Sequence, residues 1–282
     1  LDELRDLVGP ESYSLTPQEV MIENNRLMAQ LKLHGYRNVI FASEYAPIDI
    51  TSGDVYLSPN TWVLNAFLNE VINMTPFPAL IRNLPLKSPY DFHREHVEFT
   101  LSNLSEPTSK EQPTFVFAHI IAPHPPFVFG PDGQPLSPDI NYSILDGNRF
   151  LETASPEEYF AGYRGQTTYI LERMLEVVTN ILSSRSRPVV IIIQADHGPG
   201  VYWDTHSLEN TDLRERMAIF NAYYFSAGDY DGLYPEISPV NSFRVVLNSF
   251  LDTKLPMLPD RHYFFPLHQP YSLIDVTDEL VH

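Results

Sequence analysis

The chain has 282 residues, a length that can bury one large hydrophobic core or two ordinary ones. Its 36 acidic and 18 basic residues give a formal net charge of −18. A surface this acidic repels nucleic acid and anionic membranes, so neither is expected as a partner. An anionic substrate would need a local cation to hold it, and a bound metal ion is the simplest one.

The sequence contains no cysteine, which excludes disulfides, zinc ribbons and thiol nucleophiles. No segment approaches the ~18 consecutive apolar residues of a membrane-spanning helix. The chain begins at Leu1, with neither an initiator Met nor a signal peptide. We therefore expect it to be a piece of a longer protein.

The amino-terminal part shows a helix followed by a strand. Thr16-Pro17-Gln18-Glu19 has the pattern of a capping box and predicts a helix that runs to about Leu33. His34-Gly35 ends it, and residues 38–42 form a short apolar strand, an arrangement typical of a parallel sheet. Further predictions are short helices at 60–74 and 77–84, a helix at 91–104 and a buried strand at 114–121.

Residues 122–150 are rich in Pro, Gly, Asp and Asn, and we expect a long loop there. Ser155-Pro156-Glu157-Glu158 repeats the capping pattern, and apolar residues then recur every three or four residues from Phe160 to Ile181, which predicts a long helix. Pro188–Ala195 is a continuous β-branched run, typical of a parallel strand that is buried on both faces. Further predictions are a strand at 218–225, a helix at 239–251 and an irregular tail after residue 256.

Strands that alternate with helices predict the α/β class, with a mostly parallel central sheet and helices on both faces. The chain shows neither an internal repeat nor a low-complexity linker. We therefore expect residues 1–282 to form a single domain.

The strongest chemical signal is Asp196-His197-Gly198, directly after the β-branched run. Ligands of open parallel sheets bind at the carboxyl ends of the strands. A carboxylate beside an imidazole suits a divalent metal such as zinc or manganese. In the alternative interpretation, Asp196 caps a turn and His197 is an ordinary surface histidine. Gly198 and Gly200 would let the backbone turn sharply and approach a ligand.

Further histidines lie near the ends of the predicted strands. His124 follows the strand at 114–121 between prolines, which fix its backbone, and it is a candidate for binding an oxyanion or for acid–base chemistry. For His119, inside that strand, a core histidine with a hydrogen-bond partner is the favoured interpretation. His206 can bring another imidazole back over the site, although alone it would be an ordinary loop residue. The remaining histidines are interpreted as structural or solvated: His34, His93, His96, His262, His268 and His282.

These motifs together resemble the sulfatase-like branch of the alkaline-phosphatase superfamily, which includes sulfatases, lipoteichoic acid synthases and phosphoethanolamine transferases. The resemblance runs from about Leu27 to about Leu251. It rests on the Asp-His-Gly turn, the upstream HPPF loop and LMAQLKLHGYRNVIF, which is similar to the family's helix-GY-strand segment. The fold that it implies is an alkaline-phosphatase-like three-layer sandwich, truncated at its amino terminus.

The resemblance implies metal ligation by Asp196 and His197, and contacts from His124 and His206 to the transferred group. The implied activity is hydrolysis or transfer of a phosphate or sulfate ester with a divalent ion (zinc, manganese or calcium). A metal-activated hydroxyl would attack phosphorus or sulfur and form a covalent intermediate. The resemblance also implies a membrane-anchored parent protein on the extracytoplasmic side of a bacterial membrane, periplasmic or at the cell surface.

The chain departs from the family pattern at one point. The family's first metal carboxylate, and its Thr, Ser or formylglycine nucleophile, come before the helix-GY-strand segment. The residues before Leu27 do not supply a strand, an acidic ligand and a helix-borne hydroxyl in order. We expect the nucleophile to lie upstream of this chain or to be missing, so the chain alone would be inactive and its metal weakly bound.

Other function classes remain open at this stage. A non-catalytic member of the family would keep the fold and bind a glycan or a lipid head group. A cytosolic metal-dependent mutase would have a similar fold, but it should carry more His and Asp ligands than one Asp-His pair. An α/β domain without an active site is the simplest alternative.

Overall fold

A computed structural model describes residues 6, 8–9, 12–59, 74–75, 87–106, 111–137, 142 and 149–280. The chain divides into two compact units, and each is described by itself. Unit 1 combines Leu1–Gly35, Lys110–Pro113 and Ile181–His282, and unit 2 combines Tyr36–Ser109 and Thr114–Asn180. The helices expected at 60–74 and 77–84 lie outside the described residues, apart from Met74.

Unit 2 contains a three-stranded parallel sheet in the order β2-β1-β3. Its strands are β1 (Arg37–Phe41), β2 (Val55–Leu57) and β3 (Thr114–Phe117). The central strand β1 is buried from Asn38 to Phe41, as expected for a strand with a neighbour on each side. The strand predicted at 114–121 ends at Phe117, so His119 lies beyond it and not inside it.

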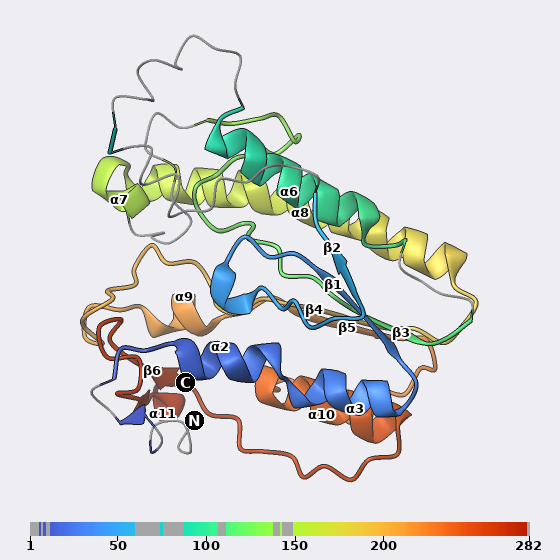
Figure 1. The fold of residues 1–282 in the computed structure, drawn as a ribbon. Helices are drawn as coiled ribbons and strands as arrows, with labels where there is room; N and C mark the ends of the chain where they lie inside the picture. The colour runs from blue at the N-terminus through green and yellow to red at the C-terminus, as the bar shows by residue number, and fades with distance from the viewer. Residues whose placement is uncertain are drawn as a thin grey trace. The chain divides into compact units, whose positions relative to one another are not determined.

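The helical elements of unit 2 are η1 (Ala46–Ile48), α6 (Pro89–Asn103), α7 (Arg149–Thr153) and most of α8 (Pro156–Ser184). Figure 1 shows α6 and α8 side by side, and Arg173 of α8 donates to Glu98 of α6 at 2.9 Å. The capping pattern at Ser155 is confirmed, since its hydroxyl accepts from the backbone of Glu158. The long helix is confirmed too, but its buried residues differ from the predicted stripe: Tyr159, Gln166, Ile170 and Val177.

A buried contact between a histidine and a carboxylate joins the end of β1 to α6. His93 of α6 is fully buried, and its Nδ1 lies 2.6 Å from Oε2 of Glu44, whose side chain is 10% exposed. The other ring nitrogen of His93, Nε2, is buried and has no hydrogen-bond partner among the described residues. Glu44 is therefore the group that compensates for burial of this imidazole.

Unit 1 contains an antiparallel pair, β4 (Val190–Gln194) with β5 (Asn221–Phe225), in which Ile192 faces Tyr223. The prediction of a parallel strand buried on both faces was wrong for β4, because its described partner is antiparallel and its side chains are half-buried or exposed. A β-branched run fits any half-buried pleated surface, so it predicts a strand but not its direction. A second antiparallel pair is formed by β6 (Tyr263–Phe264) and β7 (Ile274–Asp275).

The helices of unit 1 are α2 (Thr16–Glu23), α3 (Arg26–Leu33), α9 (Leu213–Met217), α10 (Pro239–Phe250) and α11 (Thr277–Leu280). The single helix expected from Pro17 to Leu33 is interrupted, because Asn25 caps α3 by accepting from Met28 N at 2.9 Å. Thr16 is not the cap of α2, since Leu15 occupies that position without a side-chain bond. The glycine stop is confirmed, with Gly35 at φ +80°.

Hydrogen bonds to Asp260 connect the carboxy-terminal tail to the start of α10. Its carboxylate accepts from Ser238 N at 2.8 Å, from Tyr234 Oη at 2.6 Å and from Asn241 Nδ2 at 3.1 Å. Burial raises the pKa of Asp260, but the hydrogen bonds from Ser238, Tyr234 and Asn241 outweigh it and lower that pKa overall. Its contribution to stability is therefore present above the unfolded-state value of ~3.9 and is lost as the pH falls through the folded-state pKa.

We predict that Asp260→Asn lowers the free energy of unfolding by about 2 kcal/mol at neutral pH, because charge-assisted hydrogen bonds become neutral ones. The difference from the wild type should begin to shrink below about pH 4 and should be lost only below the lowered folded-state pKa of Asp260, where the wild-type carboxylate is itself protonated. Urea titrations at a series of pH values measure both effects. The exposed Asp229→Asn variant is the control, and an equal loss in both variants would contradict the assignment.

We predict that Glu44→Ala lowers the free energy of unfolding by about 3 kcal/mol, because His93 would keep two unpaired nitrogens in the core. The matched control is Glu95→Ala, since Glu95 lies on α6 and its ion-pair partner in the described part of the chain is the exposed Lys87. That control should change stability by no more than about 0.5 kcal/mol. Thermal and urea unfolding of the three proteins test the difference, and equal stabilities would show that Glu44 does not compensate for the buried imidazole.

Candidate functional site

The Asp-His-Gly turn after β4 is fixed by backbone hydrogen bonds within unit 1. Ala195 N donates to Phe220 O, and Gly198 N donates to Arg216 O, each at 2.8 Å. A Cβ at position 198 would lie 2.0 Å from the carbonyl oxygen of Glu215, so only glycine fits there. The close approach expected of Gly198 is therefore to the protein's own backbone. It fixes where Asp196 and His197 project.

Asp196 and His197 place metal-binding atoms side by side. Oδ1 of Asp196 accepts from His197 N at 2.9 Å, and Oδ2 lies 3.5 Å from His197 Nε2. The Asp196 side chain is 68% exposed and that of His197 is 34% exposed, so ligands can reach both. This donor pair suits a divalent transition metal. The described part of the chain contains no group of three or more His, Cys, Asp or Glu residues that could hold a metal ion, so the pair supplies only part of a coordination shell.

The proton of His197 decides whether its imidazole can bind a metal. Nδ1 lies 2.8 Å from the carbonyl oxygen of Gly198 and 2.8 Å from Nη1 of Arg216. The carbonyl oxygen can only accept and the guanidinium can only donate, so Nδ1 cannot make both hydrogen bonds in one tautomer. In the tautomer in which Nδ1 carries the proton and donates to Gly198 O, Nε2 keeps its lone pair for a metal. Burial lowers the pKa of His197 and Arg216 lowers it further, against the opposing effects of Asp196 and the Gly198 carbonyl. The neutral form, which is the ligating form, is thereby favoured.

Arg216 is a local cation beside this pair. Its guanidinium lies 4.0 Å from the centre of the Trp203 ring and donates to Gly198 O at 3.3 Å. The sequence predicted that an anionic substrate would need a cationic contact in this acidic protein. Arg216 and Trp203 were not identified from the sequence, because neither belongs to a motif and Arg216 lies in α9, a short helix that the periodicity did not predict.

His206 lies in the loop between β4 and α9, also in unit 1. Its backbone N–H donates to Asp204 Oδ1 at 2.8 Å, and its Nδ1 lies 2.7 Å from Oγ1 of Thr205. Its ring stacks on that of His268, with 5.4 Å between the ring centres. Its side chain is 70% exposed, so it is accessible for binding, and its contact with a substrate stays a prediction.

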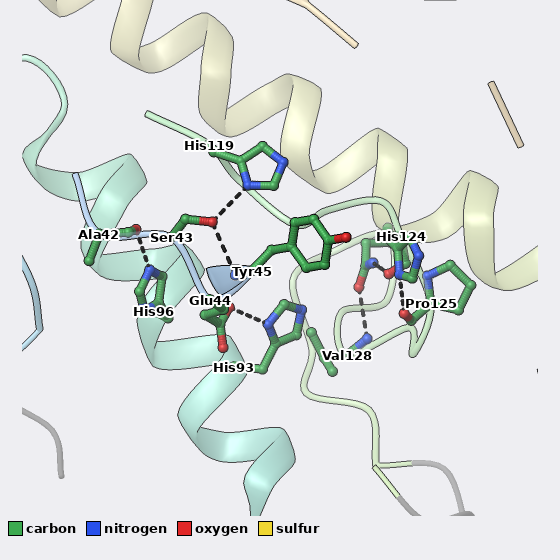
Figure 2. A network of polar contacts seen from close by, with 11 residues as sticks. Ala42, Ser43, Glu44, Tyr45, His93, His96, His119, His124, Pro125 and Val128 are labelled. Carbon is green, nitrogen blue, oxygen red and sulfur yellow. Dashed lines mark hydrogen bonds and ion pairs between the residues drawn. The ribbon is translucent and has the colours of Figure 1, made fainter. Parts of the chain in front are cut away.

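In unit 2, polar side chains gather where β1 and β3 end, as Figure 2 shows. The N–H of Tyr45 donates to Ser43 Oγ at 3.1 Å, and the same oxygen makes a hydrogen bond with His119 Nδ1, 2.8 Å away. Nε2 of His96 donates to the carbonyl oxygen of Ala42 at 2.8 Å. The hydrogen-bond partner predicted for His119 is confirmed, but the residue is half-buried and does not lie in the core.

His124 follows in the same unit, on the loop that leads away from β3 (Figure 2). It is half-buried, and Nδ1 contacts the carbonyl oxygen of Pro125. Its own carbonyl oxygen accepts from Nε2 of Gln166 at 3.2 Å. Its role in binding a transferred group stays a prediction, as do the metal-binding roles of Asp196 and His197.

The sequence did not identify the polar residues at the end of β1. Ala42-Ser43-Glu44 follows β1 just as Asp196-His197 follows β4, so the rule about carboxyl ends of strands could have found it. His93 and His96, predicted to be structural or solvated, are 0% and 7% exposed and lie on the buried face of α6. Their spacing of three residues is the signal that they share this face.

Comparison with known proteins identifies the family. A family model described as Sulfatase matches residues 7–243. No curated protein and no solved structure gives a significant match to the chain. The family match agrees with the α/β architecture and confirms the resemblance to the alkaline-phosphatase/sulfatase superfamily. Because it spans well over half of the 282 residues, the chain belongs to the sulfatase family.

Proposed function

We propose that this chain is part of a metal-dependent hydrolase or transferase that acts on phosphate or sulfate esters. The observation that carries the proposal is the paired carboxylate and imidazole of Asp196 and His197, exposed directly after β4 in a sulfatase-family chain. Their chemistry suits zinc or manganese, and the carboxylate also suits calcium. A bound divalent ion would polarise the ester and activate a hydroxyl nucleophile.

The roles of the protein's own residues follow from their positions. The carboxylate of Asp196 and Nε2 of His197 hold the ion, and the Gly198 carbonyl orients the imidazole. The family resemblance further implies that His124 and His206 would each contact non-bridging oxygens of the transferred group, which carry more charge as the bond to the leaving group breaks.

The native protein would act on the extracytoplasmic side of a bacterial membrane, with a membrane anchor outside the described residues. Within those residues, no helix is long and apolar enough to cross a bilayer. The proposed location rests on the resemblance to membrane-anchored transferases, and a phosphate or sulfate ester at that surface is the proposed substrate.

A second function is a non-catalytic domain that binds a glycan or a lipid head group. The observation that favours it is the incomplete metal shell, since the described residues supply only Asp196 and His197. The two functions differ in one measurable property. Only the enzyme needs a metal and a nucleophile for turnover, whereas the binding domain needs neither.

We predict that Asp196→Ala abolishes stoichiometric metal binding and lowers hydrolysis of model esters by at least roughly 1,000-fold, because a primary metal ligand is lost. The native protein is loaded with zinc or manganese, analysed for bound metal, and assayed with nitrophenyl phosphate, bis-nitrophenyl phosphate and nitrophenyl sulfate.

Asp229→Asn is the matched control, since this exposed carboxylate makes only a local turn contact. It should keep both metal and activity. A protein that turns over these esters equally well with and without Asp196 would contradict the metal-dependent mechanism. A protein that binds a head group but hydrolyses none of the esters would favour the binding function.

A further inference from the structure

A single polar residue, Gln166, interrupts the buried face of α8. Its side chain is 0% exposed, and the other buried residues of the helix are Tyr159, Ile170 and Val177. Burying a primary amide in such a position costs free energy unless its hydrogen bonds are made. The partners of Gln166 therefore indicate why a glutamine stands where an apolar residue would pack.

All of the described hydrogen bonds of Gln166 go to the loop that carries His124. Oε1 accepts from the N–H of Val128 at 2.7 Å and from the N–H of Phe129 at 3.1 Å, and Nε2 donates to the carbonyl oxygen of His124 at 3.2 Å. The amide thus holds both ends of the segment His124–Phe129. Backbone groups of an irregular buried segment need such partners, because no strand or helix supplies them.

The surface of α8 beside Gln166 is shaped to receive this loop. A Cβ at Gly162, one helical turn before Gln166, would lie 2.2 Å from the ring of Phe127, so the ring occupies the space that a side chain would need. Phe127 is 2% exposed and packs edge-on against Tyr159, with 5.2 Å between the ring centres. The loop is therefore seated by apolar packing at Phe127 and by hydrogen bonds on either side of it.

We propose that Gln166 is a positioning residue for His124 and that it sets where the imidazole meets the transferred phosphate or sulfate group. This inference rests on the proposed function, since His124 acts there on the substrate. Gln166 itself acts through the backbone of the loop. We call the three hydrogen bonds of Gln166 to the loop the clamp. Displacement of a substrate-binding group by about 1 Å can lower a rate by roughly 100-fold, so loss of the clamp should affect turnover more than substrate affinity.

Neither glutamate nor leucine can make all three hydrogen bonds that Gln166 makes to the loop. Glutamate would keep an oxygen for Val128 and Phe129 but would place a carboxylate against the carbonyl oxygen of His124. Leucine would fill the volume but remove the hydrogen bonds that Gln166 makes to both amides and to the carbonyl. The two variants therefore separate the two ends of the clamp.

Hydrogen exchange tests the clamp independently of any substrate. In Gln166→Leu the amides of Val128 and Phe129 should exchange at least roughly tenfold faster than in the wild type, whereas Gln166→Glu should protect them. Gln194→Leu is the matched control, because this half-buried glutamine of unit 1 donates to Asn221 and Ser242 and not to the loop. Unchanged exchange in Gln166→Leu would overturn the inference.

Kinetics of the metal-loaded native protein test the role in catalysis, with nitrophenyl phosphate and nitrophenyl sulfate as probes. Gln166→Leu should lower kcat by about 100-fold with little change in KM, close to the effect of His124→Ala. The double variant should be no slower than His124→Ala alone, because both changes remove the same contribution. Losses that multiply would show a general structural role and overturn the inference.

The outcomes separate this inference from the proposed function. If His124→Ala loses activity while folded Gln166→Leu and Gln166→Glu keep it, the positioning role is wrong and the proposed function stands. If His124→Ala is as active as the wild type, the substrate contact of His124 is wrong and so is the catalytic part of the inference. The exchange of Val128 and Phe129 then still decides whether Gln166 holds the loop.

Discussion

Irregular backbone that leaves a strand end must have its N–H and C=O groups satisfied by side chains from neighbouring elements, and the candidate residues depend on this constraint. Gln166 of α8 supplies three such bonds to the His124–Phe129 loop. His96 of α6 satisfies the carbonyl oxygen of Ala42 just beyond β1. In unit 1 the same need is met by backbone, since Gly198 donates to Arg216 O. Each loop therefore has a fixed course before any ligand arrives.

Hydrogen bonds from neighbouring elements also explain why certain polar side chains can be buried in this protein. Glu44 offsets the burial of one nitrogen of His93, and Ser238, Tyr234 and Asn241 offset the partial burial of Asp260. His93 and Asp260 thus mark places where elements that are distant in sequence are joined. Removing one partner should cost more than the bond itself is worth, because the other partner stays buried.

The sequence predicted what depends on local periodicity and missed what depends on contacts. The helix after Ser155 and the strand after Gly35 follow from side-chain spacing and glycine chemistry, and both are confirmed. The parallel direction of β4 was wrong, because a Val and Ile run is compatible with either kind of neighbour. Gln166 was missed because apolar spacing marks a buried face but does not predict a polar residue on it. Arg216 was missed because its neighbour Trp203 lies across a loop.

Net charge makes these local contacts chemically important. With a formal charge of −18, the chain repels a phosphate or sulfate ester at long range, so recognition has to come from short-range donors. Near Asp196 the candidates are the metal that this carboxylate would hold and the guanidinium of Arg216. In unit 2 the candidate is His124, a half-buried donor whose usefulness depends on its position more than on its charge. An imidazole whose contact with a substrate depends on its exact position must be held rigidly. The fully buried side chain of Gln166 holds it, because its amide oxygen and its amide nitrogen both make hydrogen bonds to the loop that carries His124.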